Sequence, residues 1–407
     1  MQPNDRIQTV IIVHLPADFH LTHRREMLLA LAMELPGSVA MLLVNRPVTF
    51  DVTPLKYPRK FWTGIWHTRV QLEPDRRTWI MTPRLAFHET IAQRSETLVG
   101  INRGLMAAQL KTTLSKYFPM ATRIIQWIYH PVQDWVFGTI EGAGKIYECY
   151  DEYRWRPTGE FDERTWIKEQ RTLQSADLTF VTTEGLGIPR AAFAERLECL
   201  PNGVPEYFFS PATQPADPID TITQPRIGYL GNARTGVDFG LLEAIFRGRS
   251  QWNLVFIGPV EDESAIRNLK RLSNVHFLGQ RPQHQIPGLL QRLDVGLVPL
   301  LDTGFTRVMA PLKLAEYLSC GVPVVATDLP DMRKFMSVVK LVPGQQAPYD
   351  SAIAECLAQG KPSVSAGLIE AARPYSWNAI CSQRLIPILS EVFRFSSQAV
   401  HVQESDF

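Results

Sequence analysis

The chain has 407 residues, of which 45% are hydrophobic and 20% are charged, and its formal net charge is +1. A chain of this length and hydrophobicity can bury a large core and is expected to form two domains. A net charge so close to zero argues against a dedicated nucleic-acid-binding protein, which normally carries a strong basic excess.

The first half of the chain alternates short apolar runs with segments of helical periodicity. The predicted strands are 9–13, 39–44, 123–129, 144–148 and 178–181, and the predicted helices are 24–35 and 163–175. Repeated strand–helix units of this kind favour a parallel sheet that is covered by helices on both faces. The proline-rich segment 210–225 then follows without periodicity, and we interpret it as a linker between two domains.

The second half repeats the same alternation more clearly. The predicted strands are 226–229, 253–257, 275–278, 295–300 and 322–327, and the predicted helices are 239–247, 263–272, 286–292 and 311–319. In a parallel sheet all strands end at one edge, and ligands of doubly wound folds bind in the crevice at that edge. The glycine-bearing strand ends of this block are therefore expected to converge on one site.

Segment 311–326 is the most informative part of the chain. It predicts a helix with Pro311 in its first turn, a glycine stop and a buried strand. Lys313 and Glu316 are three residues apart and therefore lie on one helix face. A lysine in the first turn is well placed to meet phosphate oxygens, and a glutamate one turn later can accept hydrogen bonds from ribose hydroxyls. The alternative is an i,i+3 surface ion pair, which contributes little to stability.

A second candidate for phosphate binding is the glycine-bearing loop 228–234. Gly231 lets the backbone approach a diphosphate, Arg234 can add a charge-assisted contact, and Arg281 after a later strand is a further phosphate candidate. A purely structural glycine turn is an equally common explanation of such a loop. The loop 15–20 has no glycine, and no Asp-x-Asp pair follows a strand. A dinucleotide site and a metal–diphosphate clamp are therefore not expected.

Several short motifs in the second block belong together. They are Pro201-Asn-Gly-Val204, Gly228-Tyr-Leu-Gly231, Phe256-Ile-Gly-Pro259, His276-Phe-Leu-Gly279, Asp294-Val-Gly-Leu-Val-Pro299 and the helix–strand segment 311–325. In combination they resemble the donor-nucleotide domain of a GT-B fold glycosyltransferase of the glycosyl transferases group 1 type. The resemblance is strong over 225–345 and moderate over 145–205. It points in particular to cell-envelope and exopolysaccharide enzymes such as teichuronic-acid glycosyltransferases.

The resemblance implies two Rossmann-like, doubly wound parallel-sheet domains that face a cleft, and a transfer that uses neither a metal nor a cofactor. It places Lys313 at the donor diphosphate, Glu316 at the ribose and Gly231 beside the phosphates. Many retaining members carry a glutamate eight positions before the second one, aimed at the donor sugar. This chain has Val308 at that position. The departure puts retention in doubt and favours an inverting transfer.

An inverting transfer needs a general base from the first domain to deprotonate the acceptor hydroxyl. The candidate is Asp151, which follows a predicted strand and stands between Tyr150 and Tyr153, where partial shielding would raise a carboxyl pKa. The resemblance supports this choice, because related enzymes place an acidic residue after this strand. The alternative is an ordinary acid at a helix N-terminus. Asp18 and His20, in the loop after the first strand, are the runners-up.

Basic and aromatic residues of the first block suggest surfaces for the acceptor or a membrane. Arg24 and Arg25 begin a predicted helix and can bind an anionic or lipid-diphosphate acceptor, or simply form a solvated helix start. Segment 57–66 mixes basic residues with Trp62 and Trp66, a combination that suits an anionic bilayer surface or stacking on a sugar. The alternative is that these tryptophans are core residues.

We therefore predict an acceptor-binding domain at 1–209, a linker at 210–225 and a nucleotide-sugar domain at 226–375. Residues 376–407 are predicted to form a C-terminal helix that crosses back to the first domain, followed by a tail. The predicted function is transfer of a sugar from a nucleoside-diphosphate sugar to a cell-envelope or exopolysaccharide acceptor, which is either free or lipid-linked. An epimerase on the same fold and a catalytically inactive homologue acting as an assembly partner are the alternatives.

Five cysteines without metal-ligand spacing indicate reduced thiols of a cytoplasmic protein. The sequence has neither a secretory signal pattern nor an apolar run of about 20 residues, so any work at a membrane is expected to be docking at its inner face. The expected partners are the nucleotide-sugar donor, a saccharide or lipid-linked acceptor and a membrane surface, without nucleic acid. The sugar, the nucleotide base and the linkage stay open.

Overall fold

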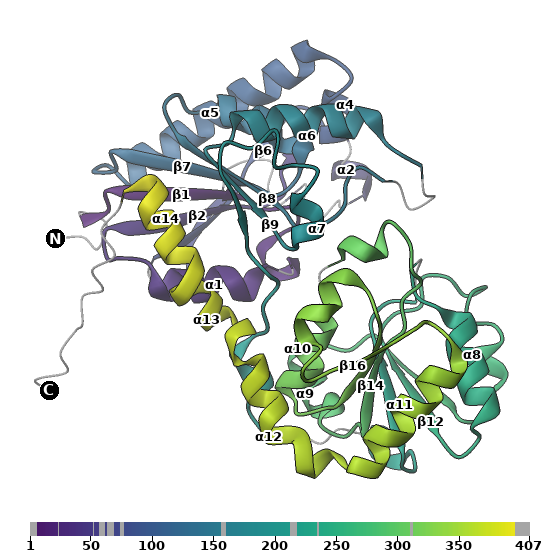
Figure 1. Ribbon diagram of the computed structural model, residues 1–407. Helices are drawn as coiled ribbons and strands as arrows, with labels where there is room; N and C mark the ends of the chain where they lie inside the picture. Colours follow the sequence, from purple (N-terminus) through teal and green to yellow (C-terminus); the bar gives the residue numbers. More distant parts are fainter. Residues whose placement is uncertain are drawn as a thin grey trace, which may run out of the picture.

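The computed structural model describes residues 6–22, 24–51, 53–56, 62, 69–73, 77–155, 160–211, 218–233, 236–309 and 312–394. Figure 1 shows two α/β domains, with the first half of the chain in the upper domain and most of the second half in the lower one. The last helices of the chain return to the upper domain. No helix of the described residues combines the length and the apolarity that crossing a bilayer requires.

The first domain is built on an eight-stranded sheet with the strand order β10-β9-β8-β7-β1-β2-β5-β4. Neighbouring strands are parallel except for β4 and β5, which are antiparallel. The strands are β1 (Thr9–His14), β2 (Val39–Val44), β4 (Arg69–Leu72), β5 (Thr78–Thr82), β7 (Arg123–Ile128), β8 (Gly144–Cys149), β9 (Leu178–Val181) and β10 (Leu197–Cys199). A separate pair joins β3 (Val48–Thr49) to β6 (Arg84–Leu85).

Helices cover both faces of this sheet. They are α1 (Arg25–Glu34), α2 (Thr53–Lys56), α4 (Glu89–Ala92), α5 (Glu96–Tyr117), α6 (Glu163–Ser175) and α7 (Glu184–Gly187). One buried cluster contains α1 residues such as Leu28 and Leu31, and another contains Met106 and Leu110 of α5 with Leu173 of α6. Strands such as β1 and β2 are buried along their whole length, because apolar side chains on both strand faces have a helical layer to pack against.

The second domain has a six-stranded parallel sheet with the order β13-β12-β11-β14-β15-β16. Its strands are β11 (Arg226–Leu230), β12 (Asn253–Ile257), β13 (Val275–Gly279), β14 (Val295–Val298), β15 (Val324–Thr327) and β16 (Lys340–Val342). The helices are α8 (Phe239–Gly248), α9 (Ile286–Leu290), α10 (Leu312–Ser319), α11 (Gln346–Gln359) and α12 (Lys361–Ala372). Residues of α9, α10 and α12 share one buried cluster and those of α8 and α11 share another, so this sheet also lies between two helical layers.

The chain crosses between the domains twice, and the two crossings touch. Val204 N–H donates to Tyr375 O at 2.8 Å, and Trp377 N–H donates to Val204 O at 3.0 Å. After this crossing, α13 (Trp377–Ile380), the π-helical turn η11 (Cys381–Leu385) and α14 (Ile386–Phe393) join the first domain's core beside α1 (Figure 1). The C-terminal helices therefore tie the first domain to the second through buried apolar contacts.

The two-domain, doubly wound architecture expected from the sequence is confirmed, and the predicted strands agree with the structure to within two residues at each end. The predicted helix 263–272 is wrong: turns lead only to a short 3-10 helix, η6 (Leu269–Arg271). The Asp262 carboxylate accepts hydrogen bonds from the backbone N–H groups of Ser264 and Ala265, and such local bonds compete with a regular helix.

The long helix α5 was not predicted. Its buried positions include two polar residues, Asn102 and Thr113, beside Met106 and Leu110. An apolar stripe interrupted in this way carries little helical signal in the sequence, so tertiary packing decides the helix.

Candidate functional site

A cavity of about 970 Å³ lies between the two domains. On the side of the first domain it is bordered by the loop after β1 and the first turn of α1, including His20 and Arg25. On the side of the second domain it is bordered by the carboxyl ends of β11 and β12, the loop after β13 and the start of α10. Strand ends of both parallel sheets therefore face one crevice, which is where doubly wound folds bind ligands.

Two glycines let the strand ends of the second domain approach each other closely. Gly231 and Gly258 have φ values of +149° and +145°, in the region that favours glycine. A Cβ atom on Gly258 would lie 2.0 Å from Gly231 O, so no other residue fits there without moving the loop. Gly231 N–H donates to Ile257 O, and Gly258 N–H donates to Gly279 O. Backbone atoms, rather than side chains, therefore form this wall of the cavity.

Lys313 and Glu316 border the cavity from the first half of α10. Lys313 Nζ lies 2.9 Å from Glu316 Oε2, so the i,i+3 ion pair forms, and the Glu316 side chain is only 8% exposed. The helix is fixed to the sheet by the buried Tyr317, whose hydroxyl donates to Gly228 O at 3.1 Å. The ion pair and a position at the cavity thus occur together, although the sequence left them as alternatives.

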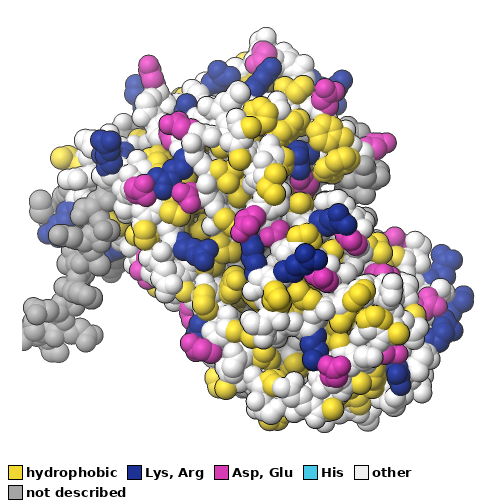
Figure 2. Space-filling view, viewed as in Figure 1, with side chains coloured by type: hydrophobic (Ala, Val, Ile, Leu, Met, Phe, Trp, Pro, Cys, Tyr) yellow, Lys and Arg dark blue, Asp and Glu magenta, His cyan; other side chains and the backbone are white. Residues whose placement is uncertain are grey.

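Other charged groups border the same cavity. Arg25 pairs with Glu26 at 2.6 Å and lies over the Phe19 ring, while Arg281 donates through Nε to Leu278 O at 3.1 Å. Burial raises the pKa of Tyr207, and the nearby carboxylates of Glu26 and Glu316 add to the effect. The cavity therefore combines cations with carboxylates and a neutral phenol. Figure 2 likewise shows basic and acidic side chains interspersed over one face of the molecule.

The other predicted site residues lie in different places. Among the described residues that border this cavity or the first-domain cavity described below, neither Asp151 nor Asp18 appears. Asp151 is half-buried directly after β8, and its Oδ1 accepts from Glu152 N–H at 2.8 Å. Trp62 is 66% exposed. Arg234, Pro311 and Trp66 lie outside the described residues.

Arg24 is buried in the first domain rather than exposed as the sequence predicted. It is 1% exposed, and its guanidinium lies 2.6 Å from Glu148 and 2.7 Å from Asn202 Oδ1. The guanidinium carbon also lies over the ring of Tyr150, at 5.3 Å from its centroid, and over that of Trp377, at 5.7 Å. Because a buried charge must be paired, this arginine connects β8, the chain crossing and the C-terminal helices, and it is not available to an acceptor or a membrane.

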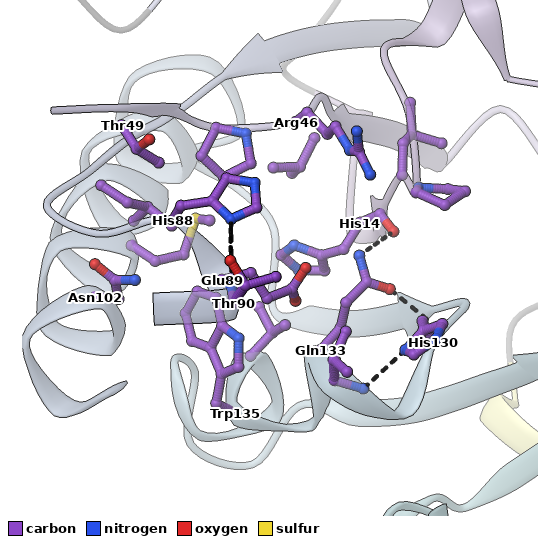
Figure 3. Close-up of a pocket in the computed structure, with 18 of the residues that line it drawn as sticks. His14, Arg46, Thr49, His88, Glu89, Thr90, Asn102, His130, Gln133 and Trp135 are labelled. Atoms are coloured by element: carbon purple, nitrogen blue, oxygen red, sulfur yellow. Dashed lines mark hydrogen bonds between the residues drawn. The ribbon is translucent and has the colours of Figure 1, made fainter. Parts of the chain in front are cut away.

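The first domain contains a second cavity, of about 460 Å³, at the carboxyl edge of its own sheet (Figure 3). Its walls come from segments that follow β1, β2, β6, β7 and β8. The polar side chains labelled around it include His14, Arg46, His88, Glu89 and His130. None of these five residues was predicted from the sequence as a site residue. The available signal was that His14 ends a buried strand and that His130 and Arg46 closely follow two others.

Burial changes the protonation of three of these groups. It lowers the pKa of His14 to about 3. It also lowers the pKa of His130 to about 4, with Lys168 adding to the effect. Burial raises the pKa of Glu89 to about 7, although Arg46 and Lys168 oppose the change. Near neutral pH the two imidazoles are uncharged and the carboxyl group is poised to gain or lose a proton.

No cluster of three or more histidine, cysteine or acidic side chains among the described residues is arranged to hold a metal ion. The described cysteines are free thiols, and burial raises the pKa of Cys149, Cys320 and Cys381, which makes them poor nucleophiles.

Residues 224–359 match the family described as glycosyl transferases group 1. The chain is also 28% identical over 206 residues to TuaH of Bacillus subtilis (strain 168), which is named for a glycosyltransferase step of teichuronic acid biosynthesis. That match covers 46% of this chain and 51% of the relative, so the chain spans about half the length of the curated relative it matches.

Solved structures resemble the chain over nearly its full length. A sucrose-phosphate synthase from Thermosynechococcus elongatus has a TM-score of 0.67 and 16% identity, and the match covers 96% of this chain and all of that one. HepE from Anabaena, solved with UDP and glucose, has a TM-score of 0.65 and 14% identity over 94% of this chain and all of that one. This chain therefore has the GT-B fold, and residues 224–359 of its second domain are similar to the glycosyl transferases group 1 family.

Proposed function

We propose that the protein transfers a sugar from a nucleoside-diphosphate sugar, bound in the cleft between the domains, to a cell-envelope or exopolysaccharide acceptor. The observation that carries the proposal is the joint placement of Lys313, Glu316 and the glycine loops at one cavity between two sheets. The match of residues 224–359 to a glycosyltransferase family supports it. The name of TuaH supports an envelope polysaccharide as the acceptor. The acceptor is free, or it is a lipid-linked form that the protein meets at the inner membrane face.

The donor diphosphate lies against the glycine loops, with Lys313 and Arg281 balancing its charge. Binding requires Lys313 to turn from Glu316 to the phosphates, which exchanges one charge-assisted contact for another. The freed Glu316 carboxylate then accepts hydrogen bonds from the ribose hydroxyls. As the bond to the sugar breaks, these same cations stabilise the charge that develops on the leaving diphosphate.

We propose that the transfer inverts the anomeric configuration. Val308 replaces the glutamate that the resemblance leads one to expect, and it packs on the first domain. Thr183 Oγ1 donates to Val308 O at 2.9 Å, and the valine side chain contacts the first-domain core. Without a carboxylate there, a direct displacement needs a base on the acceptor side. One structural neighbour, a trehalose-6-phosphate synthase, is described as transferring with retention, so the stereochemistry of the product decides the point.

The test is release of nucleoside diphosphate from a panel of nucleotide sugars, with the product's anomeric configuration read by NMR. Lys313→Ala should lower turnover of the preferred donor roughly 100-fold, because it removes a cation from the leaving group. Lys340→Ala is the matched control, since Lys340 on β16 pairs with Glu355 on α11 and does not border the cleft. An interconverted nucleotide sugar without diphosphate release would instead indicate an epimerase. Equal loss in both variants would contradict the assignment of the cleft.

A further inference from the structure

The first-domain cavity is lined by a buried imidazole with an unpartnered nitrogen and by a carboxyl group. The His14 side chain is only 4% exposed, and its Nε2 atom has no hydrogen-bond partner among the described residues. The Glu89 carboxyl group borders the same cavity, and Arg46 and Lys168 act on it electrostatically. An unpaired buried polar atom is costly, so its presence at a cavity indicates a ligand that completes it.

We propose that this cavity holds an uncharged sugar unit of the acceptor, with Glu89 taking the proton of the attacking hydroxyl and His14 orienting that hydroxyl. The inference rests on the proposed function, because an acceptor is needed only if the cleft delivers an activated sugar. It replaces Asp151 with Glu89 as the base.

The lining of the cavity matches the chemistry of a sugar ring. Trp135, Phe87 and Tyr150 supply aromatic surface, which packs well against the apolar face of a sugar. Polar groups are held in place around them: Gln133 Nε2 donates to His14 O at 3.3 Å, and its Oε1 accepts from His130 N–H at 3.2 Å. A small number of fixed polar groups among apolar walls is the usual composition of a small-ligand site.

The charges around Glu89 favour an uncharged ligand. The groups that face it are Arg46 after β2, Lys168 on α6, Asp134 in η3 (Pro131–Gly138), and the histidines of the cavity. Arg46 and Lys168 lower the pKa of Glu89, whereas burial and Asp134 raise it, and the resulting value is about 7. When Glu89 is ionised, it repels a sugar carboxylate, and the uncharged His14 and His130 do not offset this repulsion. Arg46 also borders the cavity, but the ionised Glu89 already offsets its charge, so a neutral sugar is favoured over a hexuronate.

The loop after β1 connects this cavity to the donor cleft. Its first part, from His14 to Pro16, borders the cavity, and His20 and Thr22 a few residues later border the cleft. The loop after β1 therefore borders both sites, and we expect the acceptor to extend along it from the cavity towards the donor. No other segment before residue 200 in the described chain reaches from the cavity to the cleft in so few residues.

The proposed step is a single displacement. The acceptor oxygen forms a bond to the anomeric carbon of the donor sugar, and the bond from that carbon to the diphosphate oxygen breaks with its electron pair leaving on the diphosphate. The proton of the acceptor hydroxyl passes to the Glu89 carboxylate, which later releases it to solvent. Atoms and charge balance without a metal or a redox partner, and a base with a pKa near the working pH is efficient in this role.

The first test observes Glu89 directly by carbon NMR of protein labelled in the glutamate carboxyl carbons, with the resonance assigned by its loss in Glu89→Gln. We expect it to titrate with a midpoint near 7. We also expect saturating neutral methyl hexosides to shift it, and methyl hexuronides to leave it unchanged. A midpoint in the ordinary range of glutamate, or no response to any neutral sugar, would overturn the proposal whatever the activity of the preparation.

The second test compares turnover of Glu89→Gln with that of Asp151→Asn, the matched control at the base first predicted. Nucleoside-diphosphate binding should stay intact in both, and turnover with the sugar that moves the NMR signal should fall roughly 100-fold in Glu89→Gln alone, with loss of the ascending limb of the pH profile. A fall in Asp151→Asn alone would overturn the assignment to Glu89. If the wild type bound no nucleotide, the proposed function would be contradicted, whereas the binding of a sugar in the first-domain cavity would not.

Discussion

The interdomain cleft and the first-domain cavity recognise ligands by different means. The cleft is walled by glycine backbone and by cations already paired with carboxylates. The first-domain cavity is walled by aromatic rings and by buried titratable groups, one of which has an unpartnered nitrogen. The cleft therefore suits a charged ligand that exchanges one set of ionic contacts for another. The cavity suits an uncharged ligand that supplies hydrogen bonds the protein lacks.

The backbone wall of the cleft provides the largest expected effect. Gly258→Ala places a Cβ atom 2.0 Å from Gly231 O at a φ of +145°, so the two loops must separate. We expect a loss of about 3 kcal/mol in the free energy of unfolding and loss of nucleotide binding, measured by urea denaturation and calorimetry. Gly304→Ala is the control, because a Cβ there meets no atom within 4 Å. Equal stability of the two variants would show that the wall tolerates a side chain.

The buried His14 of the first-domain cavity should make the free energy of unfolding depend on pH. Because burial lowers the pKa of His14 to about 3, the unfolded chain binds a proton that the native protein excludes once the pH falls below about 6.5. Stability is therefore complete above that pH and is lost as the pH falls towards 3, by roughly 1.4 kcal/mol per pH unit. In His14→Gln this loss should shrink by about 3 kcal/mol at pH 4, measured by urea denaturation. The exposed His20→Gln serves as control, and the same slope in all three proteins would contradict the buried neutral imidazole.

Glu89 gives a trend of the opposite sign. Because burial raises its pKa from 4.5 to about 7, the native protein keeps a proton that the unfolded chain has already lost. This contribution therefore reduces stability as the pH rises from about 4.5 to 7, and Glu89→Gln should remove the reduction. Urea denaturation of the wild type and of Glu89→Gln between pH 4.5 and 7 measures this reduction. If the difference between their free energies of unfolding did not change with pH, the raised pKa of Glu89 would be disproved.

Glu316 should contribute to the affinity for the ribose hydroxyls and not to the affinity for the phosphates. If its carboxylate accepts from ribose hydroxyls, a nucleoside diphosphate should bind the wild type roughly 10-fold tighter than its 2′,3′-dideoxy analogue. In Glu316→Ala that ratio should fall close to 1, while the dideoxy analogue keeps most of its affinity. Calorimetric titration of both proteins with both ligands gives the four dissociation constants from which the two ratios are calculated. An unchanged ratio would mean that Glu316 serves only as the partner of Lys313.

The smallest effect is expected where the domains meet through charge. Lys334 Nζ lies 3.1 Å from Glu184 Oε1 on α7, and both side chains are largely exposed. Exposed ion pairs contribute little, so Glu184→Gln should change the free energy of unfolding by less than about 0.5 kcal/mol. Val308→Ala, at the apolar contact beside it, should cost about 1 kcal/mol. Urea denaturation ranks the two, and the reverse order would contradict an apolar basis for this contact.

Most strands and the donor-side helix were predictable because their signals are local. Continuous apolar runs mark buried strands, and the spacing of Lys313 and Glu316 places both on one face of α10 whatever the rest of the fold does. The helix α5 was not predictable, because its buried face includes Asn102, whose amide donates to Phe87 O and whose oxygen accepts from Phe87 N–H. From the sequence alone, an asparagine is expected to be exposed to solvent. Its burial becomes clear only when the distant residue that satisfies its hydrogen bonds is known.

The first-domain cavity was not predictable for a related reason. His14, Glu89 and His130 come from three distant segments, and only the strand order of the sheet brings them to one edge. Arg24 shows the reverse case, since a basic residue at a helix start resembles a surface contact until its partner Glu148, more than a hundred residues later, is placed beside it. Long-range ion pairs leave no local pattern in one sequence.

The measurement that tests the central claim most directly is thermal unfolding of the wild type and of Lys313→Ala with a panel of nucleoside diphosphates. A ligand that binds only the native state adds RT ln(1 + [L]/Kd) to its stability, so at least one nucleotide should raise the wild-type melting temperature by several degrees at 100 times Kd. The account predicts that this rise largely disappears in Lys313→Ala. Equal stabilisation of both proteins, or none of either by any nucleotide, would contradict a donor site at α10.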